Sequence, residues 1–154
     1  AMSSRDPSLL DPELRRRIHC TIRDYKAAFP DGPVPFVTCT VRTNAEQAEV
    51  WAQGRTKPGK IVTWAEPGQS AHNVNPAMAV DLAFKSKTGG CDWSDALFNK
   101  IGRIAQRYGI EWGGDWCRPS RYQDLCHFQV PGWRAGHKPD PWPPMPKEET
   151  CPQC

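Results

Sequence analysis

The 154-residue sequence lacks any apolar run approaching the roughly 20 residues that cross a lipid bilayer. Its first residues also lack the apolar core of a secretory signal peptide. We therefore expect a soluble protein without stable membrane insertion, made in a cytoplasm and dependent on another factor for any export. We also expect it to be a monomer. There are no internal repeats, and 38% hydrophobic with 24% charged residues is typical of one globular domain.

Strong charge of either sign is also missing. Twenty Lys and Arg against 17 Asp and Glu give a formal net charge of +3. The only basic run is Arg15 to Arg17, inside a predicted helix, where a solvated face explains it better than a binding patch. Phosphate binding usually needs clustered basic residues, so we do not expect a nucleic-acid partner. A mild positive charge would suit an anionic polymer such as cell wall without selecting one.

The seven cysteines are odd in number and irregularly spaced, which does not indicate a disulfide framework. Cys151 and Cys154 have C-x-x-C spacing, but no second pair accompanies them and they end a segment with seven prolines after Val130. Such a segment cannot continue a helix or sheet and should lie along the surface or extend from it. We therefore divide the chain into a domain over residues 1–136 and a proline-rich tail over residues 137–154.

The first half of the chain predicts two helices, one strand and a long loop. Asp11-Pro12-Glu13 is a helix start, and apolar residues then recur at helical spacing as far as Phe29. Residues 34–42 are predicted as a strand with Val37, Cys39 and Val41 on one face. A capping box at Thr43 predicts a short helix to about Gly54, followed by a loop over residues 54–70.

In the second half, Met78 to Phe84 alternates as a strand does, with Asp81 on the face opposite the large apolar residues. A helix is predicted from Asp92 or Ser94 to a C-cap at Gly109, with Trp93 facing inward. Residues 110–112 and 125–130 are short strand candidates. This mixture predicts an α+β fold with a small antiparallel sheet flanked by helices.

Two histidines stand near acidic residues. His72 follows the long loop, His127 lies on the last candidate strand, and Asp81 shares its strand face only with small residues. A carboxylate in such a place needs a partner. Two histidines and one aspartate would leave a fourth zinc position for water, with Asp124 outside the ligand shell to handle its proton. Structural roles for the same residues explain the spacing equally well.

The paired motifs Ser70-Ala71-His72 with Ala79-Val80-Asp81, and Trp112 to Trp116 with Asp124 to Phe128, resemble the zinc D-alanyl-D-alanine carboxypeptidase/L-alanyl-D-glutamate endopeptidase family. The resemblance runs from about Leu10 to Trp133 and is closest to the phage endolysins. It implies the fold shared by DD-peptidases and hedgehog domains. It implies zinc on His72, Asp81 and His127, Asp124 as general base, and substrate contacts from Arg42, Gln47 and Ser70.

The resemblance implies an enzyme that hydrolyses the L-alanyl-D-glutamate bond in peptidoglycan stem peptides. It also implies that the protein acts on the cell wall after release from the host cytoplasm. Two alternatives stay open: a carboxypeptidase that trims terminal D-alanine, and a non-catalytic module that binds cell wall. Trp64, Trp112 and Trp116 are candidates to border a substrate groove, although a place in the core is equally consistent with each.

Overall fold

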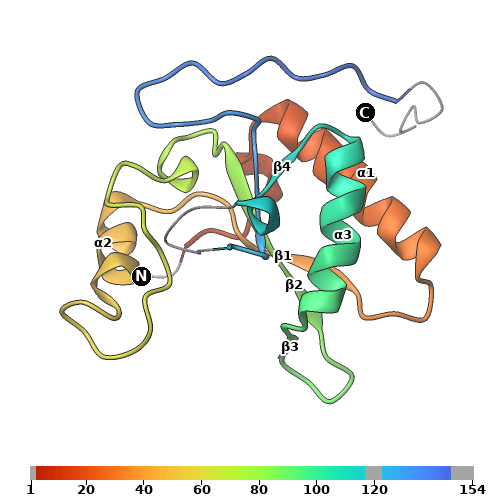
Figure 1. Cartoon of the computed structure of the whole chain (residues 1–154), viewed down its shortest axis with the longest axis horizontal. Helices are drawn as coiled ribbons and strands as arrows, with labels where there is room; N and C mark the ends of the chain where they lie inside the picture. The colour runs from red at the N-terminus through yellow and green to blue at the C-terminus, as the bar shows by residue number, and fades with distance from the viewer. Residues whose placement is uncertain (1–2, 117–122, 147–154) are drawn as a thin grey trace.

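The computed structural model describes residues 3–116 and 123–146 (Figure 1). Within them, α-helices and short 3-10 helices alternate with the strands of one antiparallel sheet, so the predicted α+β fold is confirmed. The helices are α1 (Pro12–Ala28), α2 (Asn44–Ala52) and α3 (Asp95–Arg107), with 3-10 turns η1 (Pro7–Leu9), η2 (Ala71–Asn73) and η3 (Gly113–Asp115). The strands are β1 (Pro35–Cys39), β2 (Ala79–Lys85), β3 (Cys91–Asp92), β4 (Glu111–Trp112) and β5 (His127–Gln129).

The helix boundaries follow the local signals in the sequence. Asp11 caps α1 by accepting hydrogen bonds from the backbone N–H groups of Glu13 and Leu14. Thr43 and Glu46 form the expected capping box of α2. Gly109 has a positive φ of 73° just after α3, a conformation that costs glycine little.

Helices α1 and α3 pack against each other and cover one face of the sheet (Figure 1). The core between them is formed by Leu14, Ile18, Tyr25, Val80, Leu82, Phe84, Phe98, Ile101, Tyr108, Trp112 and Phe128. Helix α2 and the loop after it lie on the other side of the sheet. The sheet face that α1 and α3 leave uncovered is therefore free to carry polar side chains.

The sheet has the order β1-β2-β5-β4, with β3 paired to the end of β2. Residues directly opposite each other in an antiparallel pair point to the same face. Asp81 lies opposite His127 on β5 and opposite Cys39 on β1. The register thus places these three residues side by side across three strands.

Two details of the prediction are wrong. Val37 and Cys39 lie on opposite faces, because a register irregularity between them pairs Val37 with Leu82 and Cys39 with Asp81. Trp93 does not lie inside the core: it precedes α3, and 55% of it is exposed. The short strand β3, which pairs with β2 just before Trp93, was not predicted either.

The described part of the tail, to residue 146, lies against the domain. Arg17 of α1 donates hydrogen bonds to the carbonyls of Tyr108 and Pro143, and its guanidinium lies 4.6 Å from the Trp142 ring centroid. The Asp140 N–H donates to the Pro131 carbonyl. Cys151 and Cys154 lie outside the described residues, and the division at residue 136 stays a prediction.

Among the described helices, none combines the length and apolar character needed to span a bilayer.

Candidate metal centre and active-site cavity

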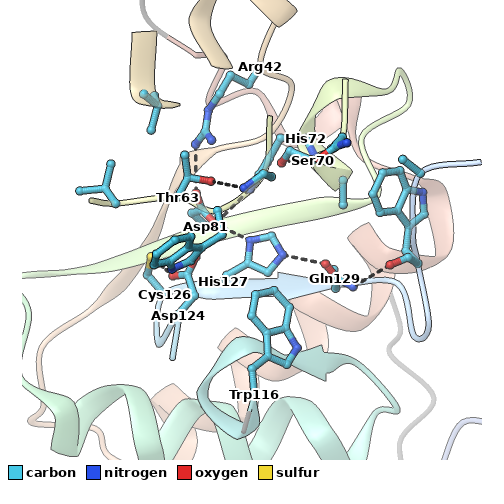
Figure 2. Close-up of a pocket in the computed structure, with 18 of the residues that line it drawn as sticks. Arg42, Thr63, Ser70, His72, Asp81, Trp116, Asp124, Cys126, His127 and Gln129 are labelled. Atoms are coloured by element: carbon cyan, nitrogen blue, oxygen red, sulfur yellow. Dashed lines mark hydrogen bonds and ion pairs between the residues drawn. The ribbon is translucent and has the colours of Figure 1, made fainter. Parts of the chain in front are cut away.

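Three side chains from different elements meet on the polar face of the sheet (Figure 2). His72 Nε2 and His127 Nδ1 each lie 3.1 Å from the same oxygen, Asp81 Oδ1. His72 sits in η2, whose N-cap Ser70 accepts a hydrogen bond from the His72 N–H. His127 reaches Asp81 because β5 pairs with β2 in register. The three residues expected to bind zinc are thus brought together.

The far nitrogen of each imidazole is held by an acceptor. His72 Nδ1 lies 2.6 Å from the carbonyl oxygen of Thr40, which can only accept, so this nitrogen carries the proton. Gln129 donates from its amide nitrogen to the Trp133 carbonyl, which turns its oxygen to His127 Nε2 at 2.9 Å. Both rings therefore point an unprotonated nitrogen at Asp81 when they are neutral.

Such an arrangement brings two nitrogen lone pairs and a carboxylate oxygen to one place, where they repel one another unless a proton or a metal ion lies between them. The pKa values of His72 and Asp81 reflect the same close contact between imidazole and carboxylate. Burial lowers the pKa of His72, but the adjacent Asp81 carboxylate outweighs it and raises the value to about 10. Burial opposes ionisation of Asp81, yet both histidines lower its pKa well below the ordinary value.

The donor set fits a divalent transition metal. Zinc sites in proteins use neutral imidazole nitrogens and carboxylate oxygens, and the other nitrogen of a ligating histidine usually donates to a carbonyl or carboxylate. Thr40 and Gln129 already provide these acceptors. The side-chain contact of Gln129 was missed from the sequence, although its position two residues after His127 on one strand signals a shared face.

Cys39 is a further neighbour of this group, also missed from the sequence. A ligand atom from each of Cys39, His72 and Asp81 lies within 4.8 Å of the other two, which is a possible metal site in its own right. However, Cys39 Sγ is 3.6 Å from His72 Nδ1, the nitrogen bonded to Thr40, and 3.4 Å from Arg42 Nη2. The thiol thus contacts the protonated nitrogen of His72 and not the nitrogen that faces Asp81.

Asp124 lies in the loop before β5 and lines the same cavity as the two histidines. Its Oδ1 accepts a hydrogen bond from the Cys126 thiol at 3.2 Å. Burial raises the pKa of Asp124 above its ordinary value, against the opposing effect of His127. A carboxyl group with a raised pKa is better suited to accept a proton than an ordinary surface aspartate.

Arg42, predicted to contact substrate, lines the cavity and reaches the metal-site residues. Its Nη2 is 3.5 Å from Asp81 Oδ2, and its Nη1 donates to Gln47 Oε1 at 3.0 Å. Gln47 is fully buried and donates to the Ala65 carbonyl. These contacts suit a residue that orients Arg42 and the loop better than one that touches a substrate. Ser70 lines the cavity while capping η2.

The cavity has a volume of about 1230 Å³, above the usual 300–1000 Å³ of small-molecule sites. Aromatic side chains form much of its wall: Trp64, Trp93, Trp116 and Trp133. The Trp116 ring packs 5.1 Å from that of His127 (Figure 2). Trp112 is instead a buried core residue. The cavity thus joins a set of candidate metal ligands, a buried carboxylate and an apolar wall.

Comparison with known proteins gives a consistent picture. Residues 64–130 match the family model described as D-alanyl-D-alanine carboxypeptidase. The chain is similar to the peptidoglycan L-alanyl-D-glutamate endopeptidase CwlK of Bacillus subtilis (strain 168), with 38% identity over 115 residues. That alignment covers 68% of this chain and 65% of CwlK, so the chain spans just under two thirds of that relative's length.

Among solved structures, the fold is similar to the crystal structure of the Serratia marcescens L-Ala D-Glu endopeptidase ChiX. The superposition has a TM-score of 0.54 at 20% identity and covers 84% of this chain and 86% of that one. At this identity the similarity establishes a shared fold, as the resemblance in the sequence predicts.

Proposed function

We propose that the chain is a zinc-dependent peptidoglycan hydrolase, because residues 64–130 match the D-alanyl-D-alanine carboxypeptidase family model and the chain is 38% identical to CwlK over 115 residues. The bond proposed for cleavage is the one between L-alanine and D-glutamate in the stem peptide. The similarity to CwlK supports this choice of bond, since that protein is an endopeptidase for it.

One observation supports the proposal most directly. Two imidazole nitrogens face one carboxylate oxygen inside a large cavity, and the other nitrogen of each ring is already hydrogen-bonded to an acceptor. A binding module for cell wall has no need of such a set, because burying and pairing these groups costs free energy without adding contact area. A catalytic zinc site with three protein ligands does need it.

The proposed roles follow from position. Zinc bound by His72, Asp81 and His127 would supply a Lewis acid and lower the pKa of a coordinated water. Asp124 would accept the proton of the attacking water and pass it to the leaving amine of D-glutamate. Arg42, which lines the cavity, would hold a substrate carboxylate.

The metal assignment is tested by elemental analysis and zinc titration of purified variants. We expect one zinc per wild-type chain and a large loss of affinity in His127→Ala. Cys39→Ser is the matched control, because the Cys39 thiol contacts the protonated nitrogen of His72 and should not be needed for binding. Undiminished zinc in His127→Ala, or its loss in Cys39→Ser, would contradict the ligand set.

The activity is tested with a synthetic pentapeptide, L-Ala-γ-D-Glu-L-Lys-D-Ala-D-Ala, blocked at its N-terminus. Release of the tetrapeptide that begins with D-glutamate is the expected result. Release of D-alanine alone would show the carboxypeptidase, and binding of cell wall without release of either product would show the non-catalytic module.

We further propose that the protein acts as a bacteriolytic endolysin on the cell wall, after release from the cytoplasm of a bacterial host. The resemblance of its motifs to phage endolysins supports this role. We expect the protein to lyse intact cells when it is supplied from outside. If it digests the purified walls of these cells but the intact cells survive, the endolysin role is wrong.

A further inference from the structure

The exposed apolar side chains of the structure gather at the cavity. Four large hydrophobic residues are exposed among the described ones, and three of them, Val62, Trp64 and Trp93, line this cavity. Exposed apolar surface gathered in one concave site usually marks where a ligand binds. The proposed roles at the metal site use none of the three.

Trp93 has the features of a fixed stacking surface. Its ring is stacked on Phe98, with centroids 6.0 Å apart and planes 21° apart, and Phe98 packs edge-on against Phe84 in the core. Phe98 is 2% exposed, whereas 55% of Trp93 is exposed. One face of the indole therefore rests on rigid core aromatics while the other is available to a ligand.

The register of β2 gives the distance from Trp93 to the metal site. Phe84 pairs with Asp92, the residue before Trp93, and lies three positions after Asp81. At about 3.3 Å per residue of strand, the Trp93 side of the cavity is roughly 10 Å from the metal-binding carboxylate. In the other direction along β2, Ala79 pairs with Gln129, whose amide donates a hydrogen bond to the Trp133 carbonyl. Trp133 therefore lies toward the opposite end of the cavity.

Charged residues lie near both ends of the cavity. Arg134 and Glu111 line it near Trp133, and both carboxylate oxygens of Glu111 already accept hydrogen bonds, from Trp116 and Gly132. Asp92 and Asp95 flank Trp93 in the sequence without lining the cavity. In a stem peptide, the carboxylates of D-glutamate and the residues after it lie on the C-terminal side of the proposed scissile bond. Arg134 can pair with these carboxylates at its end, and the two aspartates beside Trp93 disfavour them at the other end.

On the N-terminal side, L-alanine is joined through one lactyl group to the amino sugar of the glycan. Two residue-length units reach about 7 Å, so the sugar ring must lie close to the metal site when the bond is cut. This ring is uncharged and has an apolar C–H face. Given the proposed function, we infer that Trp93 is the stacking surface of a subsite for this N-acetylmuramyl ring.

The test compares two pentapeptides of the sequence L-Ala-γ-D-Glu-L-Lys-D-Ala-D-Ala, one carrying N-acetylmuramic acid and one carrying a plain N-acetyl group. Zinc-loaded wild type should cleave the muramyl substrate with a kcat/KM about fivefold higher or more, as one aromatic stacking contact allows. Trp93→Ala should remove this preference by lowering kcat/KM for the muramyl substrate only. Trp93→Phe should retain most of it.

Val34→Ala is the control, since Val34 is exposed but does not line the cavity, and it should change neither value. Equal cleavage of both substrates by wild type would overturn the subsite while leaving the proposed function intact. An equal loss on both substrates in Trp93→Ala would also overturn it, because the residue would then only support the fold. Release of D-alanine instead would overturn the proposed function, and the subsite with it.

Discussion

In the proposed zinc centre, Gln129 should control how tightly the metal binds, although it is not one of the proposed ligands. Its amide oxygen accepts from His127 Nε2 at 2.9 Å, and its amide nitrogen donates to the Trp133 carbonyl. Because Gln129 is almost fully buried, water cannot easily replace it. Replacement by Met keeps an unbranched side chain of similar length and removes both polar contacts.

The magnitude follows from these contacts. Without the acceptor, the His127 ring is free to turn or to carry its proton on the nitrogen that faces Asp81. Loss of such an outer contact typically weakens metal binding about 10- to 100-fold, or roughly 1.4 to 2.7 kcal/mol. The buried donor left without an acceptor should also cost the zinc-free protein about 1–3 kcal/mol of unfolding free energy.

The assay is competition for zinc with a chromophoric chelator, together with denaturant unfolding of the zinc-free proteins. Gln129→Glu keeps an acceptor for His127 and should bind zinc more tightly than Gln129→Met does. Gln106→Met is the control, because Gln106 donates to Asp115 on the outer side of α3. If Gln129→Met binds zinc as wild type does, the role assigned to this hydrogen bond is wrong.

Three other substitutions or truncations test the remaining roles. Asp124→Ala should fold and bind zinc but lose about 10²- to 10⁴-fold in turnover, and near wild-type hydrolysis would exclude Asp124 as the base. Arg42→Lys should melt within a few degrees of wild type yet lose roughly tenfold in kcat/KM, and unchanged kinetics would remove Arg42 from the site. A chain ending at Gly136 should keep its activity when folded but lose about 1–3 kcal/mol of stability with the contacts to Arg17, as measured by denaturant unfolding.

Local signals were sufficient to predict much of the fold from the sequence. The cap at Asp11, the capping box at Thr43 and the glycine after α3 each act within one helical turn, so the residues themselves carry the information. Strict alternation from Met78 to Phe84 likewise places Asp81 opposite the core, because the period of a strand is two.

Features that depend on pairing between distant segments could not be predicted in this way. The irregularity in β1 that turns Cys39 toward Asp81 has no local signal, and neither does the carbonyl of Thr40 that holds His72. Trp93 was misassigned because the short strand β3 stops the helix from starting earlier. Gln129 could have been found, since it shares a strand face with His127.

The most direct test of the central claim is mass spectrometry of purified peptidoglycan after digestion with the zinc-loaded protein. We expect new C-terminal L-alanine on the glycan and new N-terminal D-glutamate on the released peptides, both absent after digestion with Asp124→Ala. Intact L-alanyl-D-glutamate bonds, with or without released D-alanine, would contradict it.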